Sequence, residues 1–180
     1  MRVAGTHVLL TGATGDIGRR LATHLSDAGA RLTLVARRTQ PLAALAADLG
    51  TRATAHPADL TDRETLRTLI DTVEHAHGPV DVLVNNAGTE SAGHLTDLTA
   101  DDLENLVALN LLAPVELCRQ VLPGMTERGR GHLVNISSLA GVATFPGLAT
   151  YGATKAGLTH FTSGLRADLR GGPIGTLAVE

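Results

Sequence analysis

Short runs of leucine and β-branched residues alternate along the chain with longer stretches in which apolar residues recur every third or fourth position. The short runs are almost continuously apolar, which is typical of strands buried on both faces. They predict six strands, at residues 7–11, 31–36, 53–56, 80–85, 132–137 and 174–179. The longer stretches have a period near 3.6 and predict five helices, at residues 17–28, 41–49, 63–77, 101–125 and 151–169.

Helix start and stop signals agree with this pattern. Asp62 and Thr99 stand where N-caps are needed, and Gly29, Gly50 and Gly78 stand where helices should end. Alternation of strands buried on both faces with amphipathic helices requires right-handed crossovers on both sides of a parallel sheet. We therefore predict an α/β fold with a doubly wound, Rossmann-type parallel sheet, formed by residues 1–180 as a single domain.

The composition narrows the class of protein. With 43% hydrophobic and 18% charged residues the chain is not disordered, and no apolar run approaches the roughly 20 residues of a membrane span. A net charge of −3 gives no electrostatic basis for binding nucleic acid or an anionic membrane. Cys118 is the single cysteine, so no internal disulfide can form, and the first ten residues lack a secretory signal. We expect a cytoplasmic protein with neither nucleic-acid nor membrane partners.

A glycine-rich turn joins the first predicted strand to the first predicted helix, and reads Thr-Gly-Ala-Thr-Gly-Asp-Ile-Gly at residues 11–18. Gly12 allows a tight turn, Gly15 lets the backbone approach a pyrophosphate, and Gly18 permits close packing of helix on strand. The helix N-terminus offers free N–H groups and a positive dipole end to an anion. We expect a dinucleotide to contact Gly12, Thr14, Gly15, Asp16, Ile17 and Gly18. The alternative is a tight turn without a ligand.

The end of the second predicted strand indicates which dinucleotide binds. An NAD site places a carboxylate there against the ribose 2′-hydroxyl, but the chain reads Ala36-Arg37-Arg38. Two guanidinium groups can pair with a 2′-phosphate and stack on adenine, so we expect NADP, with NAD less favoured. The alternative is a solvated basic loop.

Three polar side chains are placed to act on one substrate. Tyr151 and Lys155 are four residues apart on a predicted helix, so they share one face. The ammonium group of Lys155 would favour the phenolate form of Tyr151 and so make it a usable acid or base near neutral pH. Ser138 ends the fifth predicted strand, and the carboxyl ends of strands form the ligand crevice of a doubly wound sheet. Singly, each residue also fits an ordinary structural role.

Taken together with the glycine turn, these residues resemble the short-chain dehydrogenase/reductase family over essentially the whole chain. Six matching motifs occur in order, and matches in this order are hard to obtain by chance. The motifs are residues 11–18, Asp59-Leu60, Asn85-Asn86-Ala87-Gly88, Asn110, Ile136-Ser137-Ser138 and Tyr151-Gly152-Ala153-Thr154-Lys155.

The resemblance implies how the cofactor is held. Asp59 and Leu60 would flank the adenine. The segment Asn86, Ala87 and Gly88 would support the cofactor ribose and the sheet beneath it. Tyr151 and Lys155 would complete the cofactor contacts, with Lys155 on the nicotinamide ribose.

The resemblance also implies an oxidoreductase that moves hydride between NADP(H) and a carbonyl or alcohol. Ser138 would polarise the substrate oxygen and Tyr151 would pass a proton to or from it, while Asn110 would hold a water in a proton relay. The family commonly pairs through its fourth and fifth helices, so a homodimer or homotetramer is expected.

Asp16 departs from the family pattern. This position is usually small in the branch with an Asn-Asn-Ala-Gly segment, and Gly15 fits the glycine spacing of a branch that modifies nucleotide sugars. A carboxylate that faced the phosphates would weaken binding, whereas one pointing to solvent would cost little. A nucleotide-sugar epimerase or dehydratase is therefore an alternative, against which the Asn-Asn-Ala-Gly segment argues.

The length also departs from the family, whose chains continue into a Pro-Gly turn, a substrate lid and a seventh strand, whereas this one stops at Glu180. We expect a chain that is incomplete relative to the family or completed by a partner, with residues 174–179 as an exposed sheet edge. Such a chain should bind the cofactor but catalyse poorly by itself. A dinucleotide-binding sensor or scaffold without turnover is the alternative function.

The remaining candidate residues concern the substrate, a metal site and the single cysteine. The loop at residues 139–150 contains Val142, Phe145 and Leu148, which fit a wall for a lipophilic ketone such as a 3-oxoacyl group; packing against a lid would account for them equally. His75 and His77 point different ways on a helix, so no metal site is expected. Cys118 is expected to be a packing residue.

Overall fold

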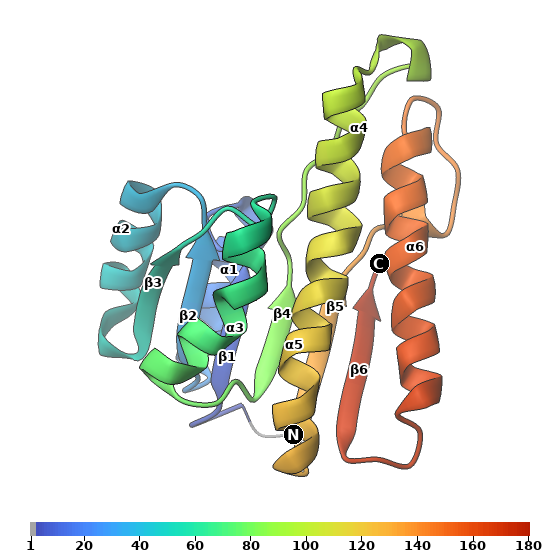
Figure 1. Ribbon diagram of the computed structural model, residues 1–180. Helices are drawn as coiled ribbons and strands as arrows, with labels where there is room; N and C mark the ends of the chain where they lie inside the picture. Colours follow the sequence, from blue (N-terminus) through green and yellow to red (C-terminus); the bar gives the residue numbers. More distant parts are fainter. Residues whose placement is uncertain (1–2) are drawn as a thin grey trace.

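The computed structural model describes residues 3–180, in which six parallel strands form one twisted sheet in the order β3-β2-β1-β4-β5-β6 (Figure 1). This order reverses direction between β1 and β4, as the predicted doubly wound fold requires. The fold class is therefore confirmed. The strands are β1 (His7–Thr11), β2 (Arg31–Ala36), β3 (Ala53–Pro57), β4 (Val82–Asn85), β5 (Gly131–Ile136) and β6 (Ile174–Val179).

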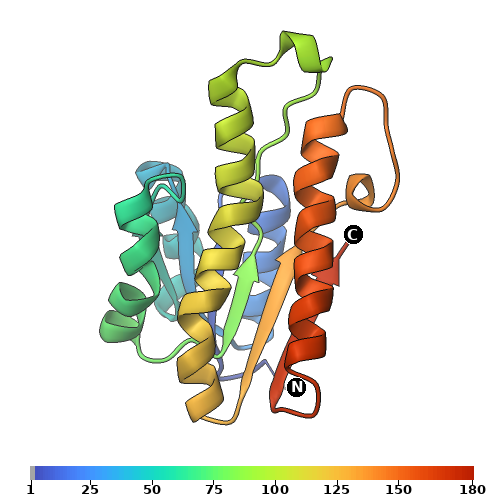
Figure 2. The same cartoon turned by 45° about the vertical axis from the view of Figure 1, so that its right-hand side comes forward.

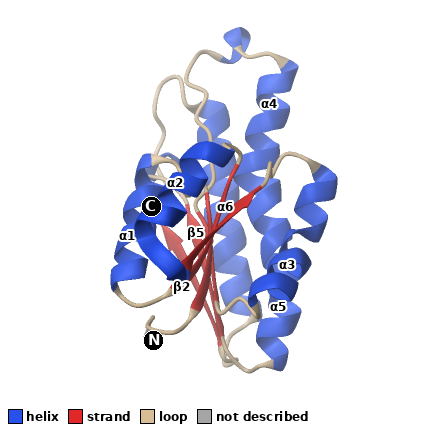
Figure 3. Ribbon diagram, turned by 90° about the vertical axis from the view of Figure 1, so that its left-hand side faces the viewer, coloured by secondary structure: helices blue, strands red, loops and turns tan. Residues whose placement is uncertain are grey.

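Helices cover both faces of the sheet, which Figure 3 shows edge-on. They are α1 (Asp16–Asp27), α2 (Thr39–Leu49), α3 (Arg63–His77), α4 (Ala100–Val107), α5 (Ala113–Glu127) and α6 (Ala149–Asp168). α1 and α2 pack on one face, and α3, α5 and α6 pack on the other. In Figure 2, α5 and α6 stand in front of β4 and β5.

The strands are buried on both faces, as their continuous apolar sequences predicted. Within β1, Leu9 belongs to the core beneath α3 and α5, whereas Val8 and Leu10 belong to the core beneath α1 and α2. Both N-cap predictions are confirmed, because Asp62 accepts a hydrogen bond from the Thr65 backbone N–H at 2.8 Å and Thr99 forms a reciprocal capping box with Asp102.

The long helix predicted at residues 101–125 is interrupted. The structure has α4 and α5 joined by a π-helical segment, Ala108–Leu112. Pro114 has no N–H to donate to the carbonyl of Asn110 four residues earlier, so the α-helical ladder cannot continue there. The prediction of one regular helix was therefore wrong at Asn110, the residue expected to act in a proton relay.

The run formed by α4, the π-helical segment and α5 corrects the expectation that no apolar stretch approaches the length of a membrane span. Ala100–Glu127 is long and apolar enough to cross a membrane by length and composition. However, Leu106, Leu117 and Val121 are buried against the rest of the chain, and packing in the core accounts for their apolar character. The sequence expectation overlooked this run because Asp, Glu and Arg residues interrupt its apolar positions.

Candidate active site

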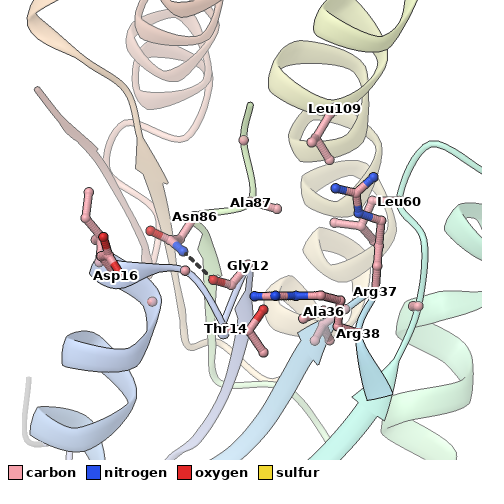
Figure 4. Close-up of a pocket in the computed structure, with 16 residues that line it drawn as sticks. Gly12, Thr14, Asp16, Ala36, Arg37, Arg38, Leu60, Asn86, Ala87 and Leu109 are labelled. Carbon is pink, nitrogen blue, oxygen red and sulfur yellow. Dashed lines mark hydrogen bonds between the residues drawn. The ribbon is translucent and has the colours of Figure 1, made fainter. Parts of the chain in front are cut away.

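A cavity of about 820 Å³ lies at the carboxyl ends of the strands, where the strand order reverses (Figure 4). Its lining contains every residue predicted to bind the cofactor except Asp59, Tyr151 and Lys155. The lining residues are Gly12, Thr14, Gly15, Asp16, Ile17, Gly18, Val35, Ala36, Arg37, Arg38, Ala58, Leu60, Asn86, Ala87, Gly88 and Leu109. The volume lies within the roughly 300–1,000 Å³ typical of ligand sites.

The three glycines of the turn have different surroundings. Gly12 has a φ of +65°, and a Cβ on it would lie 2.7 Å from the Ala87 Cα. A Cβ on Gly18 would overlap the Gly12 carbonyl, so this glycine lets the helix pack on the turn itself. A Cβ on Gly15 would meet only the Gly12 oxygen, at 3.5 Å, which leaves open space on the side facing the cavity. The turn therefore has the shape of a phosphate cradle.

The N-terminus of α1 faces this open space. Gly15 is its N-cap residue, and the N–H groups of the first turn have no partner within the helix. Asp16 lines the cavity but is solvent-exposed, and Figure 4 shows it on the far side of the turn from the two arginines. The arrangement leaves room for phosphates, and an exposed carboxylate weakens their binding little.

A hydrogen-bonded clamp fixes the turn to the end of β4. The Thr11 hydroxyl accepts from the backbone N–H groups of Asn86 and Ala87, both at 3.0 Å. The Asn86 amide donates to the carbonyl oxygens of Thr11 and Gly12, at 3.0 and 3.2 Å. The cradle is thus held in one geometry before any ligand arrives.

The end of β2 presents positive charge to the cavity. Arg37 and Arg38 line it and are exposed, and within residues 3–180 neither belongs to an ion pair. Asp59 lies near this region but not on the lining. Its carboxylate accepts from the backbone N–H and the hydroxyl of Thr61, at 2.9 and 2.7 Å. Hydrogen bonds within its own turn thus occupy one oxygen, Oδ1, of the carboxylate predicted beside the adenine.

Four lining residues were missed by the sequence reasoning: Val35, Ala36, Ala58 and Leu109. The first three end β2 or follow β3, so extending each motif back to the strand end would have found them. Leu109 lies in the π-helical segment, and its position depends on how that segment crosses the sheet. No signal in the sequence indicates this position.

Tyr151 and Lys155 lie together on the first turns of α6, as their spacing predicted. The Lys155 Nζ is 5.8 Å from the centre of the Tyr151 ring and donates to the Ile136 carbonyl at 2.9 Å. Burial lowers the pKa of Lys155 from its ordinary value. The amine and the phenol thus lie close together, which is the arrangement that proton transfer by a tyrosine requires.

Ser138 follows β5 and begins the short turn Leu139–Gly141. Its hydroxyl oxygen accepts from the Ala140 backbone N–H at 3.1 Å, and its own proton remains available to another acceptor. The turn packs tightly on α6, because a Cβ on Gly141 would lie 2.9 Å from the Lys155 carbonyl carbon. Ser138 is therefore brought to the helix that carries Tyr151 and Lys155.

Asn110 is fully buried and joins this group from the other side. Its amide accepts from the Thr89 N–H at 2.9 Å, and donates to the Thr89 carbonyl at 2.8 Å and to the Thr154 hydroxyl at 3.2 Å. A Cβ on Gly88 would lie 3.3 Å from the Asn110 Oδ1 and 3.5 Å from the Lys155 Nζ. The end of the large cavity at Gly88 thus adjoins the residues predicted to be catalytic.

Cys118 lies apart from this group. It is buried beneath the sheet, and burial raises the pKa of its thiol to about 12. A thiol with this pKa is almost wholly protonated near neutral pH, so it is a packing residue and not a nucleophile.

The chain belongs to the short-chain dehydrogenase family, whose model matches residues 6–179. Among curated relatives it is 37% identical over 172 residues to "Ketoacyl reductase HetN" of Nostoc sp., covering 94% of this chain and 60% of that protein. It is 39% identical over 168 residues to "Sulfoacetaldehyde reductase 2" of Chromohalobacter salexigens, covering 91% and 67%. It is 34% identical over 176 residues to "NADP-dependent 3-hydroxy acid dehydrogenase YdfG" of Salmonella typhimurium, covering 96% and 70%.

Solved structures agree with the family. A short-chain dehydrogenase from Streptomyces avermitilis superposes with a TM-score of 0.94 at 39% identity, covering 98% of this chain and 65% of that one. A metagenomic short-chain oxidoreductase in complex with NADP gives 0.93 at 35% identity, covering 99% and 82%. An enzyme from Burkholderia phymatum in complex with NAD gives 0.93 at 28% identity, covering 99% and 66%. The chain thus spans about two thirds of two of these structures.

Proposed function

We propose that this protein is an NADP-dependent oxidoreductase that interconverts a carbonyl compound and its alcohol. The observation that carries the proposal is that Asn110 and Lys155 lie against Gly88, on the lining of the cavity that the glycine turn also lines, with Tyr151 beside Lys155. The cavity can thus hold a diphosphate at the turn and meet an acid–base group next to Gly88. Family membership supports the same chemistry.

Each residue has a distinct task in this reaction. Bound NADP(H) supplies or accepts the hydride. The Ser138 hydroxyl donates to the substrate oxygen and orients the carbonyl, and Tyr151 transfers the proton at that oxygen. Lys155 would hold the nicotinamide ribose, and its ammonium group would stabilise the phenolate form of Tyr151. Asn110 fixes the Thr89 segment to α6 through Thr154, and Pro114 provides no N–H for the Asn110 carbonyl, at which a relay water would bind.

Arg37 and Arg38 support NADP as the preferred cofactor. They line the cavity where the 2′-phosphate would lie, and the end of β2 carries no carboxylate that could bind a 2′-hydroxyl. A relative bears the name of an NADP-dependent enzyme and one similar structure holds NADP, but another similar structure holds NAD. The proposed preference for NADP over NAD therefore rests on the positive charges of Arg37 and Arg38.

We propose a lipophilic ketone, such as a 3-oxoacyl compound, as the substrate class. Leu139, Val142 and Phe145 follow Ser138 and have 63%, 57% and 46% of their surfaces exposed. Exposed apolar side chains next to a polar acid–base group fit an apolar substrate. One relative is named a ketoacyl reductase, whereas another is named for the polar sulfoacetaldehyde, so a substrate panel must include both classes.

We further propose a cytoplasmic homo-oligomer that pairs through the α4–α5 run and α6. Val107 and Leu112 are about half exposed on this run. Light scattering tests the pairing, and Val107→Glu with Leu112→Glu should yield a monomer.

One assay separates catalysis from binding without turnover. NADPH fluorescence measures binding, and its loss in the presence of long-chain 3-oxoacyl compounds, simple ketones and sulfoacetaldehyde measures reduction. Binding with oxidation of NADPH by an apolar ketone supports the proposal. Binding without turnover on any substrate supports a sensor or scaffold, and production of a sugar epimer without net redox change supports the epimerase alternative.

A further inference from the structure

A second cavity, of about 350 Å³, lies at the opposite end of the sheet from the cofactor cavity. It is formed where β1, β2 and β3 begin and where α3 ends, which is the lower left of Figure 1. Its lining residues are His7, Arg31, Leu32, Thr33, Thr51, Arg52, Thr54, Ala76 and His77. The lining contains two arginines and no carboxylate, and it shares no residue with the cofactor cavity.

The sheet positions beneath this cavity are polar where a helix-covered strand is normally apolar. Thr33 and Thr54 pair in register on β2 and β3, so their side chains lie next to each other on one face. Further along β2, Val35 occupies the same face and belongs to the apolar core. Because this face of β2 carries Thr33 at its start and Val35 further along, the part of the sheet under the end of α3 presents hydroxyl groups.

His7 forms a fixed wall of the cavity. Its Nδ1 lies 3.0 Å from the Gly78 carbonyl and 3.1 Å from the Pro79 carbonyl, so Nδ1 must carry the proton. Its Nε2 then accepts from the Thr33 hydroxyl at 2.9 Å. Burial lowers the pKa of His7, which favours this neutral tautomer.

Carbonyl oxygens at helix ends anchor the two arginines in place. Arg31 donates to the His77 carbonyl at 3.1 Å, and Arg52 donates to the Ser26 carbonyl at 3.2 Å. Each guanidinium has five N–H donors, so these contacts leave most of the donors available. Within residues 3–180, no carboxylate forms an ion pair with either arginine.

Neighbouring positive charge acts on the histidines at this end of the sheet. Besides burial, the charges of Arg31 and His77 lower the pKa of His7, and the charge of His77 adds to burial in lowering the pKa of His56. Nearby carboxylates are engaged elsewhere. Asp81 pairs with Arg130 at 3.2 Å and accepts from the His7 backbone N–H at 3.0 Å, and Glu74 lies 3.6 Å from Arg128.

We propose that this cavity binds a phosphate group, either as inorganic phosphate or as part of a phosphate monoester. Arg31 and Arg52 offer planar forks that match a phosphate, and Thr51, Thr54 and His77 can supply further hydrogen bonds. The cavity volume lies at the low end of the range for small ligands. Bound phosphate would neutralise an uncompensated basic cluster and link the start of β2, the start of β3 and the end of α3.

Thermal unfolding at constant ionic strength tests this proposal, with inorganic phosphate and glycerol 3-phosphate compared against chloride. Phosphate at about twenty times its Kd should raise the unfolding temperature by about 4–7 °C. Arg52→Gln and Arg31→Gln should each weaken phosphate binding at least about tenfold, because each removes charge-assisted hydrogen bonds. A larger response to glycerol 3-phosphate than to phosphate identifies a monoester as the ligand.

The glycine turn is a second place where phosphate can bind, so the variants must separate the two sites. Arg37→Gln with Arg38→Gln alters only the cofactor cavity and should keep the response. Arg63→Gln, at the other end of α3, is the matched control. Thr54→Glu places a carboxylate at an exposed position in the basic cavity and should abolish the response even if the arginine variants lose stability.

Ring resonances of His77 and His56 in isotope-labelled protein give a local readout that does not depend on stability. They should shift on phosphate titration in the wild type and not in Thr54→Glu. A response that persists in Arg52→Gln and in Thr54→Glu would assign phosphate to the glycine turn or to the rest of the cofactor cavity and overturn the proposal. An equal response to chloride would overturn it as well.

Discussion

The two halves of the cofactor cleft are built in different ways. The half formed by β1, β2 and α1 depends on backbone shape: Gly12 and Gly18 are required by close contacts, and Thr11 and Asn86 hold the turn. The half formed by β5 and α6 depends on side chains. The proposed function assigns its chemistry to Ser138, Tyr151, Lys155 and the neighbouring Asn110. Substitutions in the first half should therefore act on cofactor affinity and folding, whereas substitutions in the second should act on turnover.

The largest expected effect tests the catalytic half. Tyr151→Phe should lower kcat by about two to four decades, because it removes the transferable proton, while NADPH affinity stays nearly constant. Steady-state kinetics and NADPH fluorescence measure the two quantities. His160→Gln, an exposed position on the same helix, is the control. A Tyr151→Phe enzyme that kept half its rate would remove tyrosine from the mechanism.

Lys155 should be an exception to this division, because it is expected to act on both cofactor affinity and turnover. Lys155→Ala should lower kcat and also weaken cofactor binding, since it removes the cation beside Tyr151 and a contact to the nicotinamide ribose. Loss of rate with an unchanged Kd for NADPH would restrict Lys155 to a role in proton transfer.

In the cofactor half, Arg37→Asp should reverse the preference from NADPH to NADH. Each charge-assisted contact to the 2′-phosphate contributes about ten- to hundredfold in affinity. Dissociation constants for both cofactors, measured also for Arg63→Asp as a control, check this expectation. Equal wild-type constants for NADPH and NADH would show that the arginines do not select the cofactor.

The glycine turn offers a matched pair of substitutions. Gly18→Ala forces a Cβ into the Gly12 carbonyl and should lower the free energy of unfolding by about 1–3 kcal/mol. Gly15→Ala meets only one atom at 3.5 Å, so it should cost less stability than Gly18→Ala, limited to the poorer N-cap, and should weaken cofactor binding. Denaturant unfolding and NADPH titration separate the two effects, and the same stability loss in both variants would contradict this account.

The smallest expected effect concerns Thr154, whose hydroxyl connects the backbone at Tyr151 to the side chain of Asn110. The Thr154 hydroxyl donates to the Tyr151 carbonyl at 2.7 Å and accepts from the Asn110 amide at 3.2 Å. Thr154→Val should lower kcat by about three- to tenfold, as expected for lost hydrogen bonds, and Thr154→Ser should restore it. An unchanged pH–rate profile in Thr154→Val would show that this contact does not influence the acid–base step.

The regular parts of the fold could be predicted from the sequence, because local patterns determine them. The strands β1, β2 and β6 and the helix α3 have the predicted bounds, since each combines a clear period with end signals such as Asp62 and Gly78. The π-helical segment could not be predicted, although Pro114 contributes to it, because a proline also fits the first turn of a new helix.

The candidate site divides in the same way. Its glycine turn and Tyr151–Lys155 pair are short motifs, so spacing alone places them. By contrast, the position of Leu109 on the cofactor cavity, and the basic cavity with Arg31 and Arg52, depend on segments that are far apart in the sequence. The cavity lining comes from the starts of three strands and the end of α3, which only the folded chain brings together. Their positions follow from strand order, and no pattern within one segment encodes them.

The clamp around Thr11 has a consequence for local opening of the protein. The amide protons of Asn86 and Ala87 lie just beyond β4, where loop amides normally exchange quickly with solvent. Both donate to one hydroxyl on a different strand, and the Asn86 N–H also donates to the Val84 carbonyl at 3.1 Å, so it is the Ala87 N–H whose release requires β1 and the β4 loop to separate. The Ala87 amide should therefore exchange with deuterium as slowly as those of the central strands. Thr11→Val, which leaves the Ala87 N–H without its acceptor and the Asn86 N–H with only the Val84 carbonyl, should convert the loop and the glycine turn into a unit that opens on its own.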